Sequence, residues 1–357
     1  MKKESTMRVV ATLPQDDLNK AAKAAVKFEA DGYDGLKTSE LSHDPFLPLA
    51  VAATCTTKPE LVTGITIAFA RSPMIVANMS YDLYASSKGR FALGLGTQVK
   101  GHNERRFSVK WSPPAPRLKE YVESLRAIWR AWEYGEKLNY EGEHYRFTLM
   151  TPVFSPKATG LPLIPITIAA VGPGMLRLAG RHCDGVRLHS FCTRKYMDEA
   201  IMPAVTEGLA ASGLARENFE VVSGGYILTA PDEDTVRKGF EWIRERIAFY
   251  GSTRTYLPVW ETHGMVDLGL KLHAMSLKGQ WKEMAKEISD DTVRLFAAIG
   301  THDIIVKEIG KRYCGVSDTV YTHHVPAIDP RIPPDLLQDI KRLPSAFKGF
   351  NTKHWVS

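Results

Sequence analysis

Eight short apolar segments alternate with amphipathic helical segments along the 357 residues, and this alternation constrains the fold more than any other feature. Parallel strands need crossover connections, which are usually helices, so the pattern predicts a parallel sheet covered by helices. Eight units in one chain favour a (β/α)8 barrel, the TIM barrel, which has about 250 residues and grows by insertions. The expected strands are residues 8–12, 33–37, 61–69, 90–96, 166–170, 184–189, 220–228 and 318–322.

The alternative architecture is a doubly wound open sheet. A dinucleotide-binding sheet of that type needs a glycine-rich turn after its first strand, whereas residues 13–17 read LPQDD. We therefore expect a single barrel domain over residues 7–357 that follows a loose leader at 1–6. The chain is longer than a usual barrel, and we expect the extra residues in two insertions. The first is a polar loop at 97–116 after the fourth strand, and the second is a helical segment at 265–298 after the seventh strand.

Composition and charge exclude several classes of protein. The 46 basic and 40 acidic side chains are spread along the chain, without the basic cluster that nucleic-acid binding needs. No apolar segment approaches the ~20 residues that span a bilayer, and no H-x-H or H-E-x-x-H spacing supports a metal site. The four cysteines are scattered, which is typical of reduced thiols. We therefore expect a cytoplasmic protein without a bound metal, whose partner is a small molecule rather than a nucleic acid or a membrane.

Candidate reactive groups follow the second strand, because the chemistry of a TIM barrel takes place on the loops after its strands. Glu40 and His43 supply a carboxylate and an imidazole there, which can exchange protons with a bound substrate. Asp44 has a different explanation, since an aspartate before Pro45 is a good helix N-cap. Polar contacts without a catalytic role are the alternative for Glu40 and His43.

The turn after the fifth strand has the clearest ligand-binding pattern. Backbone N–H groups at the start of a helix, together with the helix dipole, can hold a phosphate. An ordinary strand-to-helix turn is the alternative. The residues of the turn are Val171, Gly172, Pro173, Gly174 and Met175.

Three other positions are candidates for ligand contacts. Gly64 lies inside the third strand, where glycine often marks a bulge, a close approach to a ligand or tight packing. The small residues at 94–96 would leave room for a flat ring, and the polar residues after them could bind its edge. His189, at the end of the sixth strand, would face the barrel mouth, although a lone histidine is more often a hydrogen-bonded polar residue.

Four segments together resemble the bacterial luciferase-like monooxygenase superfamily, and most of all its branch that depends on the deazaflavin coenzyme F420. They are residues 38–50, 61–73, 89–98 and 168–185. The resemblance extends over nearly the whole chain. It implies a luciferase-like (β/α)8 barrel, a flavin or deazaflavin ring at the barrel mouth and, as the family expectation, a homodimer.

The resemblance also implies roles for individual residues. A non-prolyl cis peptide bond forms a bulge behind the ring in the family, and the matching bond here is Gly64–Ile65. Thr97 and Gln98 match the loop beside the ring, and the turn after the fifth strand matches the phosphate-side turn. His189 falls near another cofactor-contact position.

The activity implied is hydride transfer between reduced coenzyme F420 and a small carbonyl, imine or activated alkene, with His43 or Glu40 exchanging the proton. The family's sugar-phosphate dehydrogenases carry Asp-His where this chain has Glu40 and Leu41, so their substrate is not predicted. The first alternative is a monooxygenase that uses oxygen and reduced FMN from a separate reductase. The second is a barrel that binds a ligand without catalysis. Three arginines could attract the cofactor's anionic tail: Arg71, Arg105 and Arg106.

Overall fold

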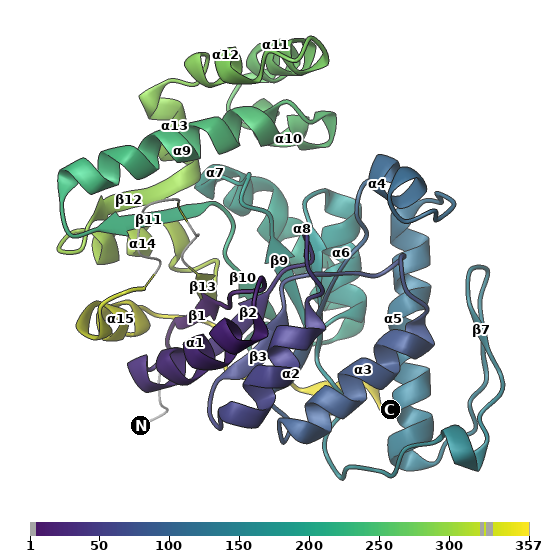
Figure 1. The fold of residues 1–357 in the computed structure, drawn as a ribbon. Coiled ribbons are helices and arrows are strands. Elements are labelled where there is room, and N and C mark those ends of the chain that lie inside the picture. Colours follow the sequence, from purple (N-terminus) through teal and green to yellow (C-terminus); the bar gives the residue numbers. More distant parts are fainter. Residues whose placement is uncertain (1–4, 322–324, 326–330, 357) are drawn as a thin grey trace.

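The computed structural model describes residues 5–321, 325 and 331–356. Within them, eight parallel strand positions close into a barrel, because the last strand pairs with the first (Figure 1). The predicted (β/α)8 TIM barrel is therefore confirmed. In chain order the strands are β1 (Arg8–Thr12), β2 (Gly35–Thr38), β3 (Glu60–Thr63) with its continuation β4 (Thr66–Ile67), β5 (Phe91–Gly96), β8 (Ile166–Ala170), β9 (Gly185–Leu188), β10 (Glu220–Val222) and β13 (Thr319–Tyr321).

Helices cover the outside of the barrel because each buries one apolar face against the strands. In α5 (Pro114–Tyr134) the predicted apolar stripe is buried from Leu118 to Trp132. Helix α1 (Leu18–Asp31) ends at Gly32, whose φ of 93° is a left-handed conformation that glycine adopts without a steric penalty. The other helices of this layer are α2 (Phe46–Cys55), α3 (Pro73–Ser86), α6 (Pro173–His182), α8 (Met202–Ser212), α14 (Ile305–Tyr313) and α15 (Pro334–Lys341).

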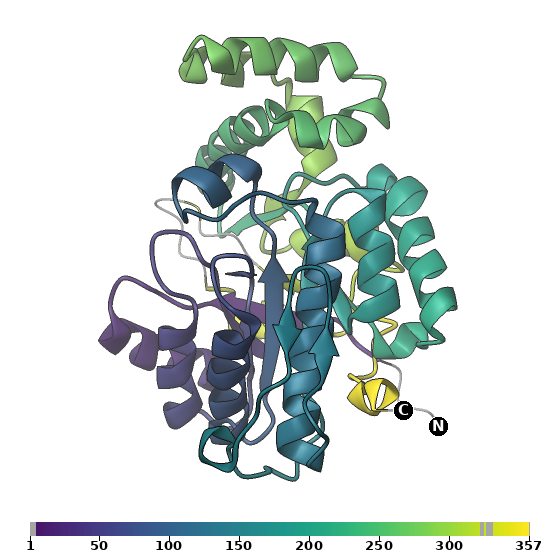
Figure 2. The same cartoon turned by 90° about the vertical axis from the view of Figure 1, so that its right-hand side faces the viewer.

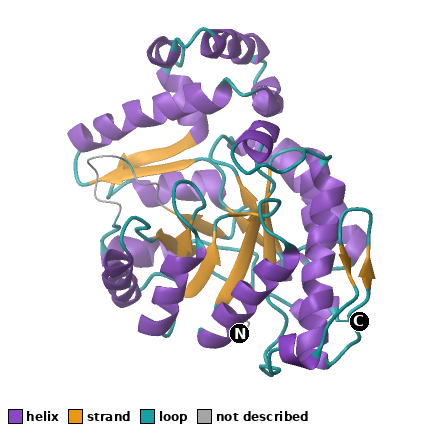
Figure 3. Ribbon diagram, turned by 45° about the vertical axis from the view of Figure 1, so that its right-hand side comes forward, coloured by secondary structure: helices purple, strands orange, loops and turns teal. Residues whose placement is uncertain are grey.

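A second layer lies over the end of the barrel where the strands finish, and we call it the cap (Figures 1 and 3). Its strands β11 (Tyr226–Ala230) and β12 (Ala297–Thr301) pair in parallel in a sheet separate from the barrel. Helix α9 (Glu233–Gly251) packs on this sheet. The remaining cap helices are α10 (Leu257–Glu261), α11 (Val266–Leu277), α12 (Trp281–Lys286) and α13 (Asp290–Phe296).

Smaller elements lie beside the barrel. Helix α4 (Lys100–Arg105) follows β5, inside the segment that is predicted as a polar loop. The hairpin of β6 (Tyr140–Glu141) and β7 (Arg146–Phe147) lies against α5 (Figure 2). Helix α7 (Arg194–Tyr196) leads through a π-helical turn into α8. From the predicted leader, Thr6 forms a bridge with Pro344 beside the C-terminal segment.

Two predicted elements are wrong in their extent or type. The strand expected at 220–228 ends at Val222, and the chain then turns into the cap. The turn includes Gly225 at a φ of 93°, where a Cβ atom would lie 2.1 Å from the Arg312 guanidinium. The segment of β12 is predicted as the end of a helical insertion, because its sequence AAIGT has no periodicity that distinguishes strand from helix. Residue 322, at the end of the last predicted strand, lies outside the described residues.

The barrel interior carries paired charges at its base. Arg8 Nη2 lies 3.2 Å from Glu60 Oε2, and Arg8 Nη1 lies 2.8 Å from Glu220 Oε1. The Thr319 hydroxyl donates to the same Glu220 oxygen, and Arg187 Nη2 lies 3.7 Å from Glu220 Oε2. Buried charges are tolerated where an opposite charge and hydrogen bonds compensate them. At the base of the barrel, opposite charges therefore compensate one another.

Among the helices of the described residues, none combines the length and the apolar composition that crossing a bilayer requires.

Candidate active site at the barrel mouth

The chain between β3 and β4 forms the centre of the candidate site. The peptide bond Gly64–Ile65 is cis, as the family resemblance implies. The Gly64 amide donates to the Thr38 carbonyl (2.6 Å), and the Ser39 hydroxyl donates to the Gly64 carbonyl (2.8 Å). The Glu40 amide donates to the Ile65 carbonyl (3.0 Å). Hydrogen bonds thus join this bulge to the end of β2 and to the loop that carries both candidates for proton transfer.

The glycines of β5 have a packing role. A Cβ atom at Gly94 would lie 1.9 Å from the Thr63 carbonyl oxygen, and one at Gly96 would lie 2.5 Å from Ile65 Cδ1. Thr63 and Ile65 fill the space beside these two glycines, and the predicted room for a flat ring at residues 94–96 stays a prediction. The glycines allow β3, the bulge and β5 to approach closely.

Glu40 is held in an ion pair. Its side chain is only 7% exposed, and its carboxylate accepts from Arg71 Nη1 at 2.7 and 2.8 Å. The Ile67 amide also donates to Glu40 Oε2 (2.7 Å), which ties β4 to the loop after β2. Arg71 Nη2 lies 3.0 Å from Asp44 Oδ2, while Asp44 Oδ1 accepts from the Phe46 amide (2.8 Å) at the start of α2. Pro45 stands at the cap position of α2, and Asp44 before it accepts from the Phe46 and Leu47 amides, as the predicted capping requires. Arg71 is occupied by two carboxylates.

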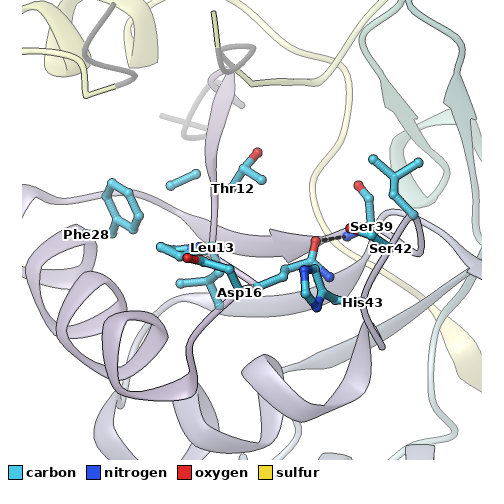
Figure 4. A pocket seen from close by; sticks show the side chains of 11 residues that line it. Thr12, Leu13, Asp16, Phe28, Ser39, Ser42 and His43 are labelled. Atoms are coloured by element: carbon cyan, nitrogen blue, oxygen red, sulfur yellow. Dashed lines mark hydrogen bonds between the residues drawn. The ribbon is translucent and has the colours of Figure 1, made fainter. Parts of the chain in front are cut away.

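His43 is in different surroundings, because it is exposed and lines a cavity of about 470 Å3 (Figure 4). The cavity lies between the loops that follow β1 and β2. Gln15 joins these loops: its Oε1 accepts from the Ser39 amide (3.0 Å), and its Nε2 donates to the Asp44 carbonyl (3.4 Å). The described residues around the cavity include His43 but not Glu40, so the structure separates the two candidates. The residues that line the cavity are Ala11, Thr12, Leu13, Pro14, Gln15, Asp16, Phe28, Ser39, Leu41, Ser42 and His43.

The turn after β8 leads into a helix whose N-terminus is open. Gly172 is the N-cap of α6, and within the described chain no side chain caps this helix and no acidic residue lies in its first turn. Apart from the neighbouring residues and the backbone of α6 itself, no described atom lies within 4 Å of a Cβ atom built at Gly172 or at Gly174. The Tyr196 hydroxyl donates to the Val171 carbonyl (3.0 Å) and holds the start of the turn. Met175, the last predicted residue of the turn, is half-buried. An anion could therefore approach the N–H groups of this helix terminus directly.

Thr97 and Gln98 follow β5 and are both half-buried. The Asn103 side-chain amide donates to the Thr97 carbonyl (3.0 Å), which fixes the loop. Gln98 has a φ of 58°, and its side-chain oxygen accepts from the Val99 amide (2.9 Å). The Gln98 side chain is therefore bound to its own loop, and its predicted contact with a ring stays a prediction.

His189 joins the barrel mouth to the cap. Its Nδ1 accepts from the Phe191 amide (2.9 Å), which leaves the proton of the neutral ring on Nε2. The ring centroid lies 4.8 Å from that of Tyr256, nearly parallel, and 4.6 Å from that of Tyr250, edge to face. Burial lowers the pKa of His189 to about 4, so the imidazole is neutral near pH 7. The two tyrosines come from the cap, and neither is among the site residues predicted from the sequence.

Two cations inside the barrel are not among the residues predicted from the sequence. Lys37 from β2 and Arg187 from β9 both lie beside Gly64. Lys37 stands in the short strand sequence GLKT, and a lysine between buried strand residues is the signal that could have identified it. Among the described residues, no group of three or more His, Cys, Asp or Glu side chains could hold a metal ion.

Comparison with known proteins identifies the relatives of this chain. The family model described as luciferase-like monooxygenase matches residues 4–317. An uncharacterized protein of Mycobacterium tuberculosis is 45% identical over 305 residues, which cover 85% of this chain and 90% of that protein. The 5,10-methylenetetrahydromethanopterin reductase of Archaeoglobus fulgidus is 29% identical over 270 residues, which cover 74% of this chain and 76% of the reductase.

The same fold is found among solved structures. The coenzyme F420-dependent tetrahydromethanopterin reductase of Methanopyrus kandleri superimposes with a TM-score of 0.74 and 22% identity. The superposition covers 95% of this chain and 98% of the reductase. At this level of identity, the comparison establishes a shared barrel fold.

Proposed function

Because the chain belongs to the luciferase-like monooxygenase family, whose members are oxidoreductases that use coenzyme F420 or FMN, we propose that it uses coenzyme F420. The proposed reaction is hydride transfer between reduced F420 and a small carbonyl, imine or activated alkene. The observation that carries this proposal is the open helix terminus at Gly172, without a side-chain cap, which would hold the phosphate that F420 and FMN share. The similarity to proteins whose names state F420 dependence supports the choice of F420.

The residues present fit a phosphate-bearing flavin or deazaflavin. The turn at Gly172 and Gly174 is open and would bind the phosphate through backbone N–H groups. When bound, the cofactor supplies the hydride chemistry, so the protein's part is to bind, to orient and to move a proton. Glu40 would act as a positioning residue, because its carboxylate is committed to Arg71 and to the Ile67 amide.

We assign the proton transfer to His43, because it lines the same cavity as Ser39, whose hydroxyl donates to the Gly64 carbonyl of the bulge. His43→Ala is expected to lower the rate of substrate reduction by about 10²- to 10⁴-fold, which is the usual contribution of a general acid or base. Cofactor affinity should stay unchanged. The measurement is stopped-flow oxidation of the prebound reduced cofactor by a panel of small carbonyls, imines and alkenes. His144→Ala, on the hairpin beside α5, is the control, and equal rates for both variants would contradict the assignment.

The cofactor itself is tested by titration of the purified protein with F420 and with FMN, followed by fluorescence. We expect F420 to bind more tightly than FMN. Protein that binds FMN but not F420 would exclude this proposal. The alternative is then a two-component monooxygenase, which the family description favours, and which oxygen uptake with reduced FMN and substrate would reveal.

We also propose that the enzyme is a homodimer, because an apolar segment between β7 and β8 is strongly exposed. Leu149, Val153 and Phe154 are 78%, 89% and 77% exposed. Exposed apolar patches of this kind often mark protein interfaces. Sedimentation equilibrium should give the mass of two chains, and Phe154→Glu should shift the protein towards one. A wild-type mass of one chain would contradict the dimer.

A further inference from the structure

Lys37 is a buried lysine without a counter-charge among the described residues. It belongs to β2, is 8% exposed, and its side chain points into the barrel. Its Nζ lies 4.4 Å from the centroid of the Tyr321 ring, and its Cδ lies 3.5 Å from the position of a Cβ atom at Gly64. In the described part of the chain no carboxylate pairs with it, whereas Arg8 at the base of the barrel contacts two.

Arg187 lies beside the same glycine. Its Nη1 is 3.8 Å from the Cβ position of Gly64, and its Nε donates to the Thr167 hydroxyl (2.8 Å). The Arg187 guanidinium also lies near Glu220, so its charge is partly compensated. Burial, and then the charge of Arg187, lower the pKa of Lys37 to about 8. The lysine is therefore still mainly protonated near pH 7, and the two side chains place a net positive charge beside the cis bulge.

An uncompensated buried charge is costly unless a ligand or a neighbour of opposite charge approaches it. Contact with the Tyr321 ring offsets part of this cost through a cation–π interaction. Both cationic side chains reach the space beside Gly64, and the proposed function places the cofactor ring against the bulge that begins at this residue. Two-electron reduction of a flavin or deazaflavin ring increases the negative charge on its pyrimidine part. Charge close to that part of the ring is one of the means by which a protein adjusts such a cofactor.

We propose that Lys37, together with Arg187, forms a cationic floor behind Gly64 that favours binding of the reduced cofactor over the oxidised one. This inference rests on the proposed function, since it takes the ring to lie against the bulge at Gly64–Ile65. Lys37 would then be a cofactor-binding residue inside the barrel, in addition to the residues of the loops described above. Lys37 acts here through its charge and does not need to transfer a proton.

The test compares the dissociation constants of oxidised and reduced cofactor, measured under anaerobic conditions with F420 and with FMN. In Lys37→Met the preference for the reduced form is expected to fall about tenfold, because a unit charge close to the ring is lost. For a two-electron couple this change lowers the midpoint potential of the bound cofactor by about 30 mV. Lys37→Arg should keep most of the preference. Lys23→Met, which removes an exposed lysine from α1, should have no effect.

The possible outcomes distinguish a failure of the Lys37 inference from a failure of the proposed function. If wild-type protein binds the cofactor and folded Lys37→Met keeps the same preference, Lys37 only fills the barrel core and this inference is overturned. If wild-type protein binds neither cofactor, the proposed function fails and this inference fails with it. Circular dichroism checks the fold of each variant. If Lys37→Met does not fold, Lys37→Gln replaces it, because the amide keeps a polar atom at the same depth.

Discussion

Gly174→Glu is expected to weaken cofactor binding by about a hundredfold or more while the fold stays intact. A carboxylate at the second position of α6 would repel the cofactor phosphate and occupy its place, and like charges brought together cost several kcal/mol. Outside the adjacent residues and the backbone of α6, the described chain has no atom within 4 Å of a Cβ atom at Gly174, so a larger side chain can start from this position without a clash. An acidic residue in the first turn also stabilises the helix, by about 0.3–1 kcal/mol, because its charge interacts favourably with the helix dipole. Fluorescence titration gives the affinity, and thermal unfolding gives the stability.

Two variants at the same position separate charge from size. Gly174→Gln adds nearly the same volume without the charge and should lose much less affinity than Gly174→Glu. Gly174→Ala should bind the cofactor almost as the wild type does. If Gly174→Glu binds the cofactor with wild-type affinity, the turn does not hold the phosphate, whatever the activity of the enzyme.

Gly94→Ala is expected to lower the free energy of unfolding by about 3 kcal/mol or more, because overpacking a closed barrel forces backbone shifts. The new Cβ atom would lie 1.9 Å from the Thr63 carbonyl oxygen and 2.9 Å from Arg187 Nε. Two hydrogen bonds also cross this junction, since the Thr63 hydroxyl donates to the Gly94 carbonyl and accepts from the Gly94 amide, both at 2.8 Å. Urea unfolding followed by circular dichroism measures the loss.

The matched control is Gly310→Ala in α14. A Cβ atom there would make ordinary contact with Leu343 at 3.5 Å, and alanine favours a helix by about 1 kcal/mol over glycine. This variant should be as stable as the wild type or slightly more stable. Equal stability of Gly94→Ala and wild type would show that β3 and β5 do not approach as closely as the structure indicates.

The sequence predicts the barrel because its signals are local. The apolar stripe of α5 repeats every three or four residues, and the short apolar strands alternate with helices of this kind. The cap sheet escaped prediction for the opposite reason. Strand β12 has a short, small-residue sequence that is stable as a strand only beside β11, about 70 positions earlier. Likewise, the end of β10 depends on Gly225 meeting Arg312, and no local pattern encodes that contact.

For the candidate site, the sequence indicated which residues are candidates but not what surrounds their side chains. The residues after β2, the bulge and the turn before α6 were all identified as candidates, and the family resemblance implied the cis bond. Glu40 and His43 are three residues apart, and in the sequence either side chain is a candidate for proton transfer. Only the structure separates them, because Arg71 binds Glu40 while His43 lines the cavity.

The sequence by itself therefore determined the barrel, the order of its strands and the loops where a cofactor could bind. These features follow from periodicity and helix-capping patterns among residues close together in the chain. The tertiary structure decided which side chains meet. Lys37 and Arg187 both lie beside Gly64, although they stand 27 positions before it and 123 positions after it in the chain. Closure of the barrel brings these side chains together, and burial then gives their charges an influence that no sequence pattern reveals.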